Sequence, residues 1–171
     1  MITKESEKWN VWKAQLTPTT CSICRERNGK IFNKFKNIRF PPIHLCCRCK
    51  VVRLTVAVVG TISELGTMGA DWWIYYKKQL PYYYISKEQA EKIGWKRSKG
   101  NLDVVAPGKM IGGLRYYNDN GILPDEVGRI WYEADINYTG GFRNNERIVY
   151  SNDGLVFYTI DHYETFYEVA E

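Results

Sequence analysis

The chain has 171 residues, a formal net charge of +5, 44% hydrophobic residues and 15% aromatic residues. This length suits one ordinary domain or two small ones, and the composition can bury a core, which excludes wholesale disorder. The first residues, MITKESEKW, are polar and charged, so no secretory signal is visible and a protein that is cytoplasmic as synthesised is expected. The longest apolar run begins at Val51, contains Arg53 and is too short to span a bilayer. We therefore expect a soluble protein without a membrane partner.

The positive charge is concentrated in the first part of the chain. Residues 1–69 hold 12 Lys and Arg against 4 Asp and Glu, a net charge of 12 − 4 = +8, whereas residues 70–171 hold 12 and 15, a net charge of −3. A basic segment of this kind favours polyanionic partners such as nucleic acid, although it is also typical of a solvated surface.

All five cysteines lie between Cys21 and Cys49. Disulfides normally spread over the fold that they stabilise, so one tight cluster with an odd count indicates a metal site in a reducing compartment. A C-x-x-C pair followed about twenty residues later by imidazole and thiolate groups suits tetrahedral zinc. The alternative is a small core of buried free cysteines. For zinc, Cys21, Cys24 and Cys49 are the expected ligands, and either His44 or Cys47 is the fourth.

Two stretches of the sequence, LTPTTCSICRERNGKIF and PPIHLCCRC, resemble the C-terminal end of the phage Mu head-morphogenesis (minor head protein) family. The resemblance covers roughly residues 9–54 and implies that the chain is related to a head protein or is a fragment of one. The family often has H-P-x-C-R-C where this chain has HLCCRC. We predict a small Cys/His zinc-knuckle-like module over residues 1–54 and a linker over residues 55–70 that begins as a strand.

The remaining residues, 71–171, carry helix signals first and strand signals afterwards. A short helix is expected over 71–79, and a second one follows in SKEQAEKIG, where Ser86 and Gln89 can form a capping box and Gly94 can end the helix. β-Branched and aromatic residues then dominate in RIWYEADINY, RIVYSND and GLVFYTIDHY. This order predicts an α+β fold with an antiparallel sheet.

One strand in this region places acidic side chains together. Side chains alternate along a strand, so Glu133 and Asp135 share one face. If the next strands are its neighbours, Arg143 and Arg147 join that face and His162 closes the following strand. A carboxylate base, an imidazolium acid and cations beside a phosphate are the groups needed to cleave RNA without a metal. The alternative is an ordinary surface salt-bridge network.

From Leu80 to its end, the chain resembles the barnase-like, guanyl-preferring bacterial ribonucleases without insertion or deletion. The likeness rests on LPYYYISKEQAEKIGW, SKGNL, VAPGKMIGG, GRIWYEADINYTGGFRN and DHYETF. It implies N-terminal helices packed on a five-stranded antiparallel sheet, an RNA substrate, and cleavage through a 2′,3′-cyclic phosphate without a cofactor. The ribonuclease domain is expected over residues 71–171.

The resemblance also implies roles for individual residues. Glu133 would be the general base and His162 the general acid, and the scissile phosphate would be held by Lys87, Arg143 and Arg147. Tyr163 would line the subsite of the next base. Asp135 would pair with the two arginines, and further structural roles would fall to Arg129 with Asp153 and to Asn101. Guanine would be cradled by main-chain groups of the loop Tyr116, Tyr117, Asn118, Asp119 and Asn120.

That loop is where the chain departs from the family. The family has an Arg-Glu pair, whose Glu accepts hydrogen bonds from guanine, whereas this chain has Asp119 and Asn120. A shallower guanine preference is therefore expected. The family also implies a small acidic immunity protein resembling barstar, and the joint likeness suggests a ribonuclease toxin carried by a virion or a delivery system. Two alternatives are a non-enzymatic head-assembly protein and a nucleic-acid-binding zinc module.

Overall fold

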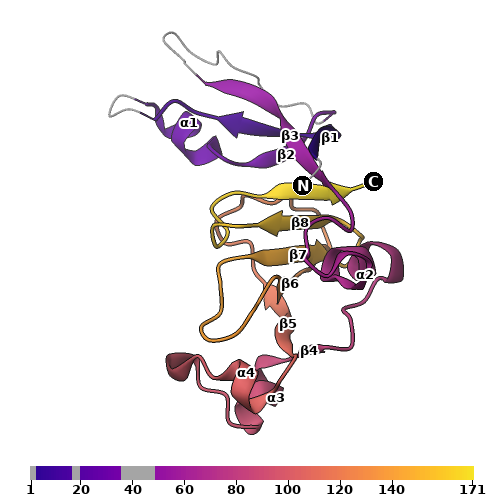
Figure 1. Cartoon of the computed structure of the whole chain (residues 1–171). Helices are drawn as coiled ribbons and strands as arrows, with labels where there is room; N and C mark the ends of the chain where they lie inside the picture. Colours follow the sequence, from indigo (N-terminus) through magenta and orange to yellow (C-terminus); the bar gives the residue numbers. More distant parts are fainter. Residues whose placement is uncertain (1–2, 17–19, 36–48) are drawn as a thin grey trace.

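The computed structural model describes residues 3–16, 20–35 and 49–171, and a single sheet runs through this part of the chain (Figure 1). Nine strands follow one another across the sheet in the order β2-β1-β3-β9-β8-β7-β6-β5-β4. Their bounds are β1 Thr3–Lys13, β2 Ile31–Asn33, β3 Lys50–Val58, β4 Tyr84–Ile85, β5 Met110–Tyr116, β6 Trp131–Asp135, β7 Arg147–Ser151, β8 Val156–Thr159 and β9 Tyr167–Ala170.

The helices are short, and their ends follow the signals in the sequence. They are α1 Ser22–Arg27, η1 Gly66–Met68, α2 Ala70–Lys77, α3 Lys87–Lys92, η2 Arg97–Lys99 and α4 Leu102–Val105. The predicted capping box is confirmed, because the Ser86 hydroxyl accepts from the Gln89 N–H and the Gln89 side chain accepts from the Ser86 N–H. Gly94 follows α3 with φ +101°, as the expected stop signal requires.

The implied antiparallel series is present, but the sheet does not end there. Strands β5 to β9 pair antiparallel with one another in chain order. The expectation of five strands is wrong for the whole sheet because β3 pairs in parallel with β9, with Val56 opposite Glu168. Two further strands, β1 and β2, continue the sheet from β3, and the short β4 lies parallel to β5 at the other side. The edge of β9 is thereby covered, which removes an exposed row of backbone donors and acceptors.

The segment expected as a linker is structured at both ends. Residues 55–58 belong to β3, and residue 70 begins α2. The segment between them is tied to α2, because the N–H groups of Gly60 (2.7 Å) and Ile62 (3.1 Å) donate to the carboxylate of Asp71, a fully buried residue of that helix. The division of the chain into residues 1–54, 55–70 and 71–171 stays a prediction.

One hydrophobic core joins the front strands, defined as β1, β2 and β3, to the remainder of the sheet. Trp9, Val11, Ile31 and Leu54 of the front strands pack with Trp131, Val149, Phe157 and Phe166. The Ile31 N–H also donates to the Ile122 carbonyl at 2.8 Å. The front strands are therefore an extension of the fold. A second core lies between α2 and the sheet, where Ile74 packs with Ile148.

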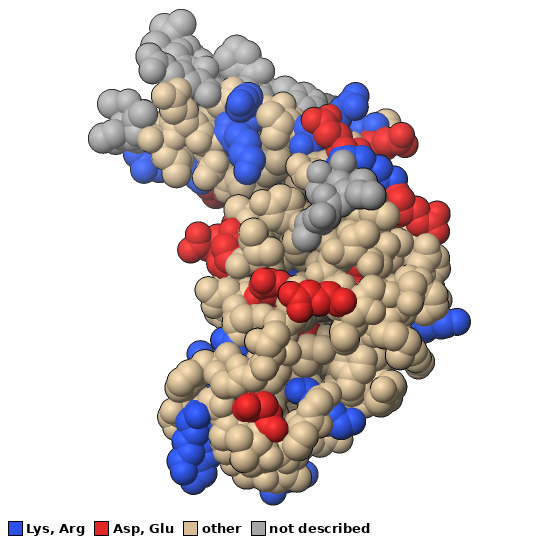
Figure 2. Space-filling view, viewed as in Figure 1, with Lys and Arg blue, Asp and Glu red and all other residues tan. Residues whose placement is uncertain are grey.

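Charged side chains are unevenly distributed on the face shown in Figure 2. Lys and Arg side chains are visible over the front strands and near the opposite end, by α3 and α4, and several Asp and Glu side chains lie between them. Among the described residues, no helix is long and apolar enough to cross a membrane.

Candidate active site

A cavity of about 910 Å³, here called the central cavity, is lined by all five residues for which catalytic roles were expected. They come from separate elements: Lys87 begins α3, Glu133 lies on β6, Arg143 on the loop after β6, Arg147 opens β7, and His162 follows β8. Strand pairing sets their proximity, because β6 and β7 are neighbours with Asp135 opposite Arg147 and Glu133 opposite Val149.

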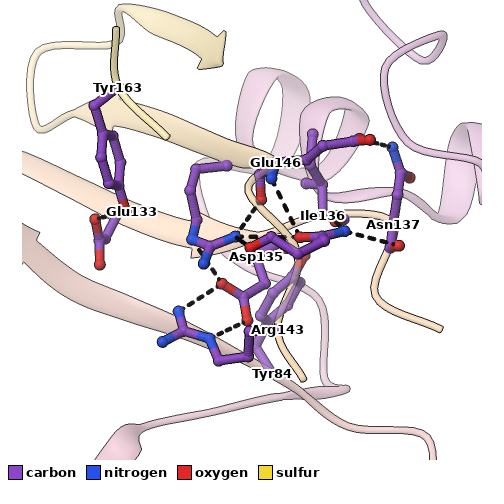
Figure 3. A network of polar contacts seen from close by, with 10 residues as sticks. Tyr84, Glu133, Asp135, Ile136, Asn137, Arg143, Glu146 and Tyr163 are labelled. Carbon is purple, nitrogen blue, oxygen red and sulfur yellow. Dashed lines mark hydrogen bonds and ion pairs between the residues drawn. The ribbon is translucent and has the colours of Figure 1, made fainter. Parts of the chain in front are cut away.

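Asp135 organises the two arginines beside the cavity (Figure 3). Its side chain is fully buried, and it accepts from Arg143 Nε and Nη2, both at 2.6 Å. Arg147 Nε lies 3.0 Å from the same carboxylate. Burial by itself lowers the pKa of Arg143, but the bonded carboxylate of Asp135 outweighs burial and raises it. The predicted pairing of Asp135 with both arginines is confirmed, because both guanidinium groups lie within ion-pair distance of its carboxylate.

Arg147 is held more tightly than Arg143. Its side chain is 4% exposed, compared with 15% for Arg143. Its Nη1 donates to the carbonyls of Asn144 and Glu146, both at 2.7 Å. A guanidinium with this many fixed partners keeps one orientation, so the cation is preorganised toward the cavity.

Glu133 has one hydrogen-bond partner among the described residues, the hydroxyl of Tyr163 at 2.5 Å from Oε2. Burial, followed by this hydrogen bond, raises the pKa of Tyr163 well above its ordinary value, so the phenol stays a donor. The carboxylate is half-buried and is oriented by a neutral group, which leaves its second oxygen available to a ligand.

The loop that carries His162 is held by a carboxylate that sequence reasoning missed. Asp161 accepts from the Thr159 hydroxyl and from backbone N–H groups of residues 164 and 165. These bonds hold a turn in which His162 and Tyr163 both have positive φ, 56° and 74°. The signal was a Thr-x-Asp sequence followed by another threonine, Thr165, whose hydroxyl also bonds to Asp161. The His162 ring is exposed and lies 4.6 Å from the Tyr163 ring.

The charge of the central cavity is mainly positive. The Lys87 ammonium has no hydrogen bond or ion pair with the described residues, so it is available to a ligand in the cavity. A fourth cation, Arg97 of η2, also lines the cavity and was not predicted. Its signal was the run of three basic residues in KRSK. The approach of this segment to the loop at Phe142 requires Gly100, where a Cβ atom would lie 2.9 Å from the Phe142 nitrogen.

The loop expected to hold a base forms a second, open hollow of about 680 Å³, called the loop hollow. It is lined by Tyr116, Tyr117, Asn118, Asp119 and Asn120, and it shares His162 and Tyr163 with the central cavity. The Tyr116 and Tyr163 rings stack at 5.1 Å between centroids, and burial raises the pKa of Tyr116 to about 12. All the residues for which base-binding roles were expected are therefore adjacent to the cavity.

The side chain of Asn118 shapes this loop. Its backbone is left-handed, with φ 52°, and its buried side chain donates to the Leu123 carbonyl and accepts from the Leu123 N–H. Asn120 is also bound internally: its amide donates to the Tyr163 carbonyl at 3.2 Å and accepts from the Ile122 N–H at 3.2 Å. Asp119 is exposed and has no hydrogen bond or ion pair with the described residues.

The two remaining structural expectations are also met. Arg129 donates to both carboxylate oxygens of Asp153, at distances of 2.7 to 3.0 Å. This pairing is the first cause of the lowered pKa of Asp153. Asn101 forms a turn, accepting from the Lys96 N–H and donating to the Gly94 carbonyl.

Two of the expected zinc ligands, Cys21 and Cys24, are close together in the described part of the chain. Cys21 and Cys24 lie together at the start of α1, where Cys21 Sγ accepts from the Cys24 N–H at 3.4 Å. His44 and Cys47 lie outside the described residues. Among the residues that are described, no group of three or more His, Cys, Asp or Glu side chains is placed to hold a metal ion. Zinc binding by Cys21, Cys24, Cys49 and one of the other two stays a prediction.

Comparison with known proteins now identifies the family. The family model for ribonuclease matches residues 74–170, more than half of the chain. The chain belongs to this ribonuclease family. A ribonuclease of Bacillus intermedius is 54% identical over 112 residues, 66% of this chain and 66% of the relative. A ribonuclease of Heyndrickxia coagulans is 56% identical over 110 residues, 64% of this chain and 96% of the relative.

Membership confirms the expectation of a bacterial ribonuclease-family enzyme with an α+β fold of the barnase type. The matched region spans about two thirds, 66%, of the length of the Bacillus intermedius and Bacillus pumilus ribonucleases. The family model begins at residue 74, so the resemblance of residues 9–54 to the phage head family stays a prediction.

Proposed function

We propose that this chain is an endoribonuclease that cleaves single-stranded RNA by metal-free general acid–base transphosphorylation, with a preference for cleavage 3′ of guanine. The observation that carries the proposal is the convergence of a half-buried carboxylate, Glu133, and an exposed imidazole, His162, in one cavity with four cations. These groups supply a base, an acid and charge stabilisation, and they belong to a chain of the ribonuclease family.

In the proposed first step, Glu133 takes the proton of the ribose 2′-hydroxyl. The 2′-oxygen attacks phosphorus, and the bond from phosphorus to the 5′-oxygen breaks. His162, protonated beforehand, gives its proton to that leaving oxygen. The product is a 2′,3′-cyclic phosphate. In the second step, the oxygen of a water molecule attacks phosphorus and the bond from phosphorus to the 2′-oxygen breaks. His162 removes a proton from the water, and Glu133, protonated in the first step, gives its proton to the 2′-oxygen.

The cations would act on the phosphate as negative charge develops on its oxygens. Arg143 and Arg147 are oriented by the buried Asp135, so they need little reorganisation during the reaction. Lys87 would add a mobile charge from the first turn of α3. Tyr163 would orient Glu133 through its hydroxyl and line the subsite of the next base.

We propose that guanine occupies the loop hollow. Main-chain groups of residues 116–120 would read its O6 acceptor. The internal hydrogen bonds of Asn120 leave that amide with little capacity for a base, whereas the exposed Asp119 retains a carboxylate that can accept from the guanine N1–H and N2 amino groups. Asp119 therefore replaces, at least in part, the family glutamate that the sequence lacks.

The biological setting that we propose is a toxin system. A ribonuclease would be linked to a phage-head-type segment, and a small acidic, barstar-like protein would neutralise it by covering the central cavity. Support for an acidic inhibitor comes from the excess of cations there: Lys87, Arg97, Arg143 and Arg147 against Glu133. Titrating RNA cleavage with the product of each neighbouring gene tests this setting, and cleavage that persists with every such product argues against it.

We also propose one structural zinc ion in the front segment, held by Cys21, Cys24, Cys49 and either His44 or Cys47. The neighbouring positions of Cys21 and Cys24 support this proposal. Native mass spectrometry under reducing conditions should give one zinc per chain, and Cys21→Ser should abolish it. A metal-free wild-type chain after refolding with zinc would show that the cysteines serve another purpose.

The proposed function is tested by incubating the chain with a GpU dinucleoside monophosphate and with single-stranded RNA in the presence of EDTA. We expect cleavage in both cases and transient accumulation of guanosine 2′,3′-cyclic phosphate. Absence of cleavage would contradict the activity. Cleavage that EDTA abolishes would contradict the metal-free mechanism, and cleavage without the cyclic product would contradict transphosphorylation.

A further inference from the structure

A third hollow, of about 490 Å³, lies where the front strands meet the loop after β5. This front hollow is lined by residues that include Lys8, Trp9, Trp12, Arg27, Lys30 and Gly121. The chemistry proposed above does not use it. Eight of its fourteen lining residues lie between residues 8 and 33, outside the region matched by the ribonuclease family model, so this hollow is a feature that the front of the chain adds to the family fold.

The three hollows follow one another along the molecule. The central cavity and the loop hollow share His162 and Tyr163. The loop hollow is also lined by Asn120 and Ile122, and Gly121 between them lines the front hollow. Shared walls therefore place the loop hollow between the other two.

This order corresponds to the direction of an RNA strand. If the scissile phosphate lies in the central cavity and the guanosine 5′ to it lies in the loop hollow, the strand continues from the guanosine 5′-oxygen. Asn120 and Ile122 line the loop hollow and Gly121 between them lines the front hollow, so these three residues separate the two hollows. The nucleotide that precedes the guanosine would therefore reach the front hollow.

The charges of the front hollow suit a phosphate group. Four cations, Lys8, Arg27, Lys30 and Arg129, and two acids, Asp125 and Glu126, line it, a difference of 4 − 2 = +2. Arg129 is paired with Asp153, and the Asp125 carboxylate accepts from the Asn118 amide. The charges of Arg129 and Asp125 are therefore already partly compensated within the protein and act less strongly on a ligand.

Two of the remaining cations are positioned by aromatic rings. The Lys8 ammonium lies 4.9 Å from the Trp9 ring and the Arg27 guanidinium lies 5.1 Å from the Trp12 ring, while both indoles are buried. The indole faces are thus covered by cations, which favours a phosphate and its sugar over a stacked base as the ligand.

Lys30 of the front hollow lies beside the stretch of residues 120–122. Its Nζ lies 3.7 Å from the position that a Cβ atom on Gly121 would occupy, so the ammonium lies against the backbone that separates the two hollows. Its ion pair with Glu26 is long, at 3.6 Å, and Glu26 is exposed. The next residue, Ile31, is hydrogen-bonded to Ile122, which fixes β2 against the loop before any ligand arrives.

We propose that the front hollow is a subsite for the nucleotide immediately 5′ of the cleaved guanosine, with Lys30 binding the phosphate that joins the two. The inference rests on the proposed ribonuclease function and extends its substrate from a dinucleotide to a longer strand. The front strands thereby serve catalysis by binding RNA, without providing a group that reacts.

The experiment compares kcat/KM for ApGpU with kcat/KM for GpU, because the first substrate adds only the upstream nucleotide and its phosphate. In the wild-type chain we expect the ratio to be about fivefold in favour of ApGpU, the size of one exposed charge contact. Lys30→Ala should bring the ratio close to one, and Lys30→Arg should keep it. Lys34→Ala is the matched control, since it removes the same charge four residues along the chain, outside the front hollow, and should not change the ratio.

Salt dependence provides a measurement that needs no variant. A phosphate contact to a single strand releases counterions, so the log–log slope of kcat/KM against salt should be steeper for ApGpU than for GpU by roughly 0.7. A wild-type ratio of one with equal slopes would overturn the subsite while leaving the ribonuclease function in place. That result is also expected if the hollow binds a protein instead. If GpU itself is not cleaved, the proposed function fails and the subsite fails with it.

Discussion

The central cavity and the loop hollow share two residues but are built in different ways. Two cations of the central cavity, Arg143 after β6 and Arg147 at the start of β7, are tied to the fully buried Asp135. One wall of the loop hollow is the single stretch of residues 116–120, most of them exposed, whose shape depends on the side chain of Asn118. We infer that the first region is set by the sheet and tolerates little change, whereas the second can change its specificity with modest effects on stability.

The sharpest test of this contrast is removal of the proposed base or acid. Glu133→Ala and His162→Ala should each lower kcat/KM on GpU by ~10²–10⁴-fold, because proton transfer in the transition state is lost. Glu133 is half-buried and His162 exposed, so neither change should lower the melting temperature much. Glu91→Ala, an exposed carboxylate of α3 outside the central cavity, is the control for a loss of charge. Near-wild-type turnover of both variants would refute the assignment of roles.

A second test separates support of the phosphate from support of the fold. Arg147→Ala should lower turnover by ~10²-fold through lost charge stabilisation. It should also destabilise the chain by about 3 kcal/mol, because the buried Asp135 keeps only Arg143 as a cationic partner and the carbonyls of Asn144 and Glu146 lose a donor. Lys87→Ala should lower kcat without this cost, since the Lys87 side chain has no hydrogen bond or ion pair with the described residues. Urea unfolding measured beside kcat distinguishes them. Equal stability of the two variants would contradict the structural role of Arg147. A Lys87→Ala effect confined to KM would contradict the role of Lys87 in the transition state.

A third test concerns the wall that the two regions share. Asp161→Asn should weaken the turn that holds His162 and Tyr163, lowering kcat/KM about tenfold through misplacement of the imidazole. The hydrogen bonds of Asp161, chiefly from Thr165, outweigh the effect of burial and lower its pKa. A group whose folded pKa is lowered stabilises the fold above its unfolded pKa and loses this effect as pH falls through the folded value.

The stability difference between wild type and Asp161→Asn should therefore be present at pH 7, at roughly 1 kcal/mol because the group is partly exposed. It should begin to fall near pH ~4, the ordinary pKa of an aspartate, and should vanish only when the pH is below the lowered folded pKa. Thermal melts across this pH range measure it. Asp103→Asn, another exposed acid, serves as the comparison. A difference that grows toward low pH would show that Asp161 acts in another way.

Local signals in the sequence were sufficient for much of this site. Strand alternation placed Glu133 and Asp135 on one face, and the capping box at Ser86 positioned the helix that begins with Lys87. These features depend on residues close together in the chain. The parallel pairing of Val56 with Glu168 could not be predicted in this way, because periodicity shows which face of a strand is buried but not which distant strand lies beside it.

The same limit applies to the loop hollow. The sequence showed that the family glutamate is replaced by Asn120, but the hydrogen bonds of that side chain to Ile122 and to the carbonyl of Tyr163 depend on how the loop packs against a turn 43 residues away. The groups of the central cavity were therefore easier to predict than base selectivity. Base selectivity depends on which side chains of the loop have no hydrogen bond within the protein and can bind a base.

The smallest expected effects are those on base selectivity, and they test the loop hollow directly. Asp119→Asn should lower the ratio of kcat/KM for GpU over ApU by roughly fivefold, because a neutral amide can accept from one guanine donor and presents its own NH₂ group to the other. Asn120→Glu should raise the ratio by roughly tenfold: a glutamate cannot donate to the Tyr163 carbonyl, so the carboxylate is released toward the hollow and can accept from both donors. Glu164→Gln, which alters a carboxyl on the opposite wall of the same hollow, is the matched control and should leave the ratio unchanged. If Asp119→Asn has no effect while Asn120→Glu raises the ratio, the main chain alone provides the present selectivity. If neither substitution changes the ratio, the base does not bind in this hollow, and the contrast between a fixed central cavity and an adjustable loop is wrong.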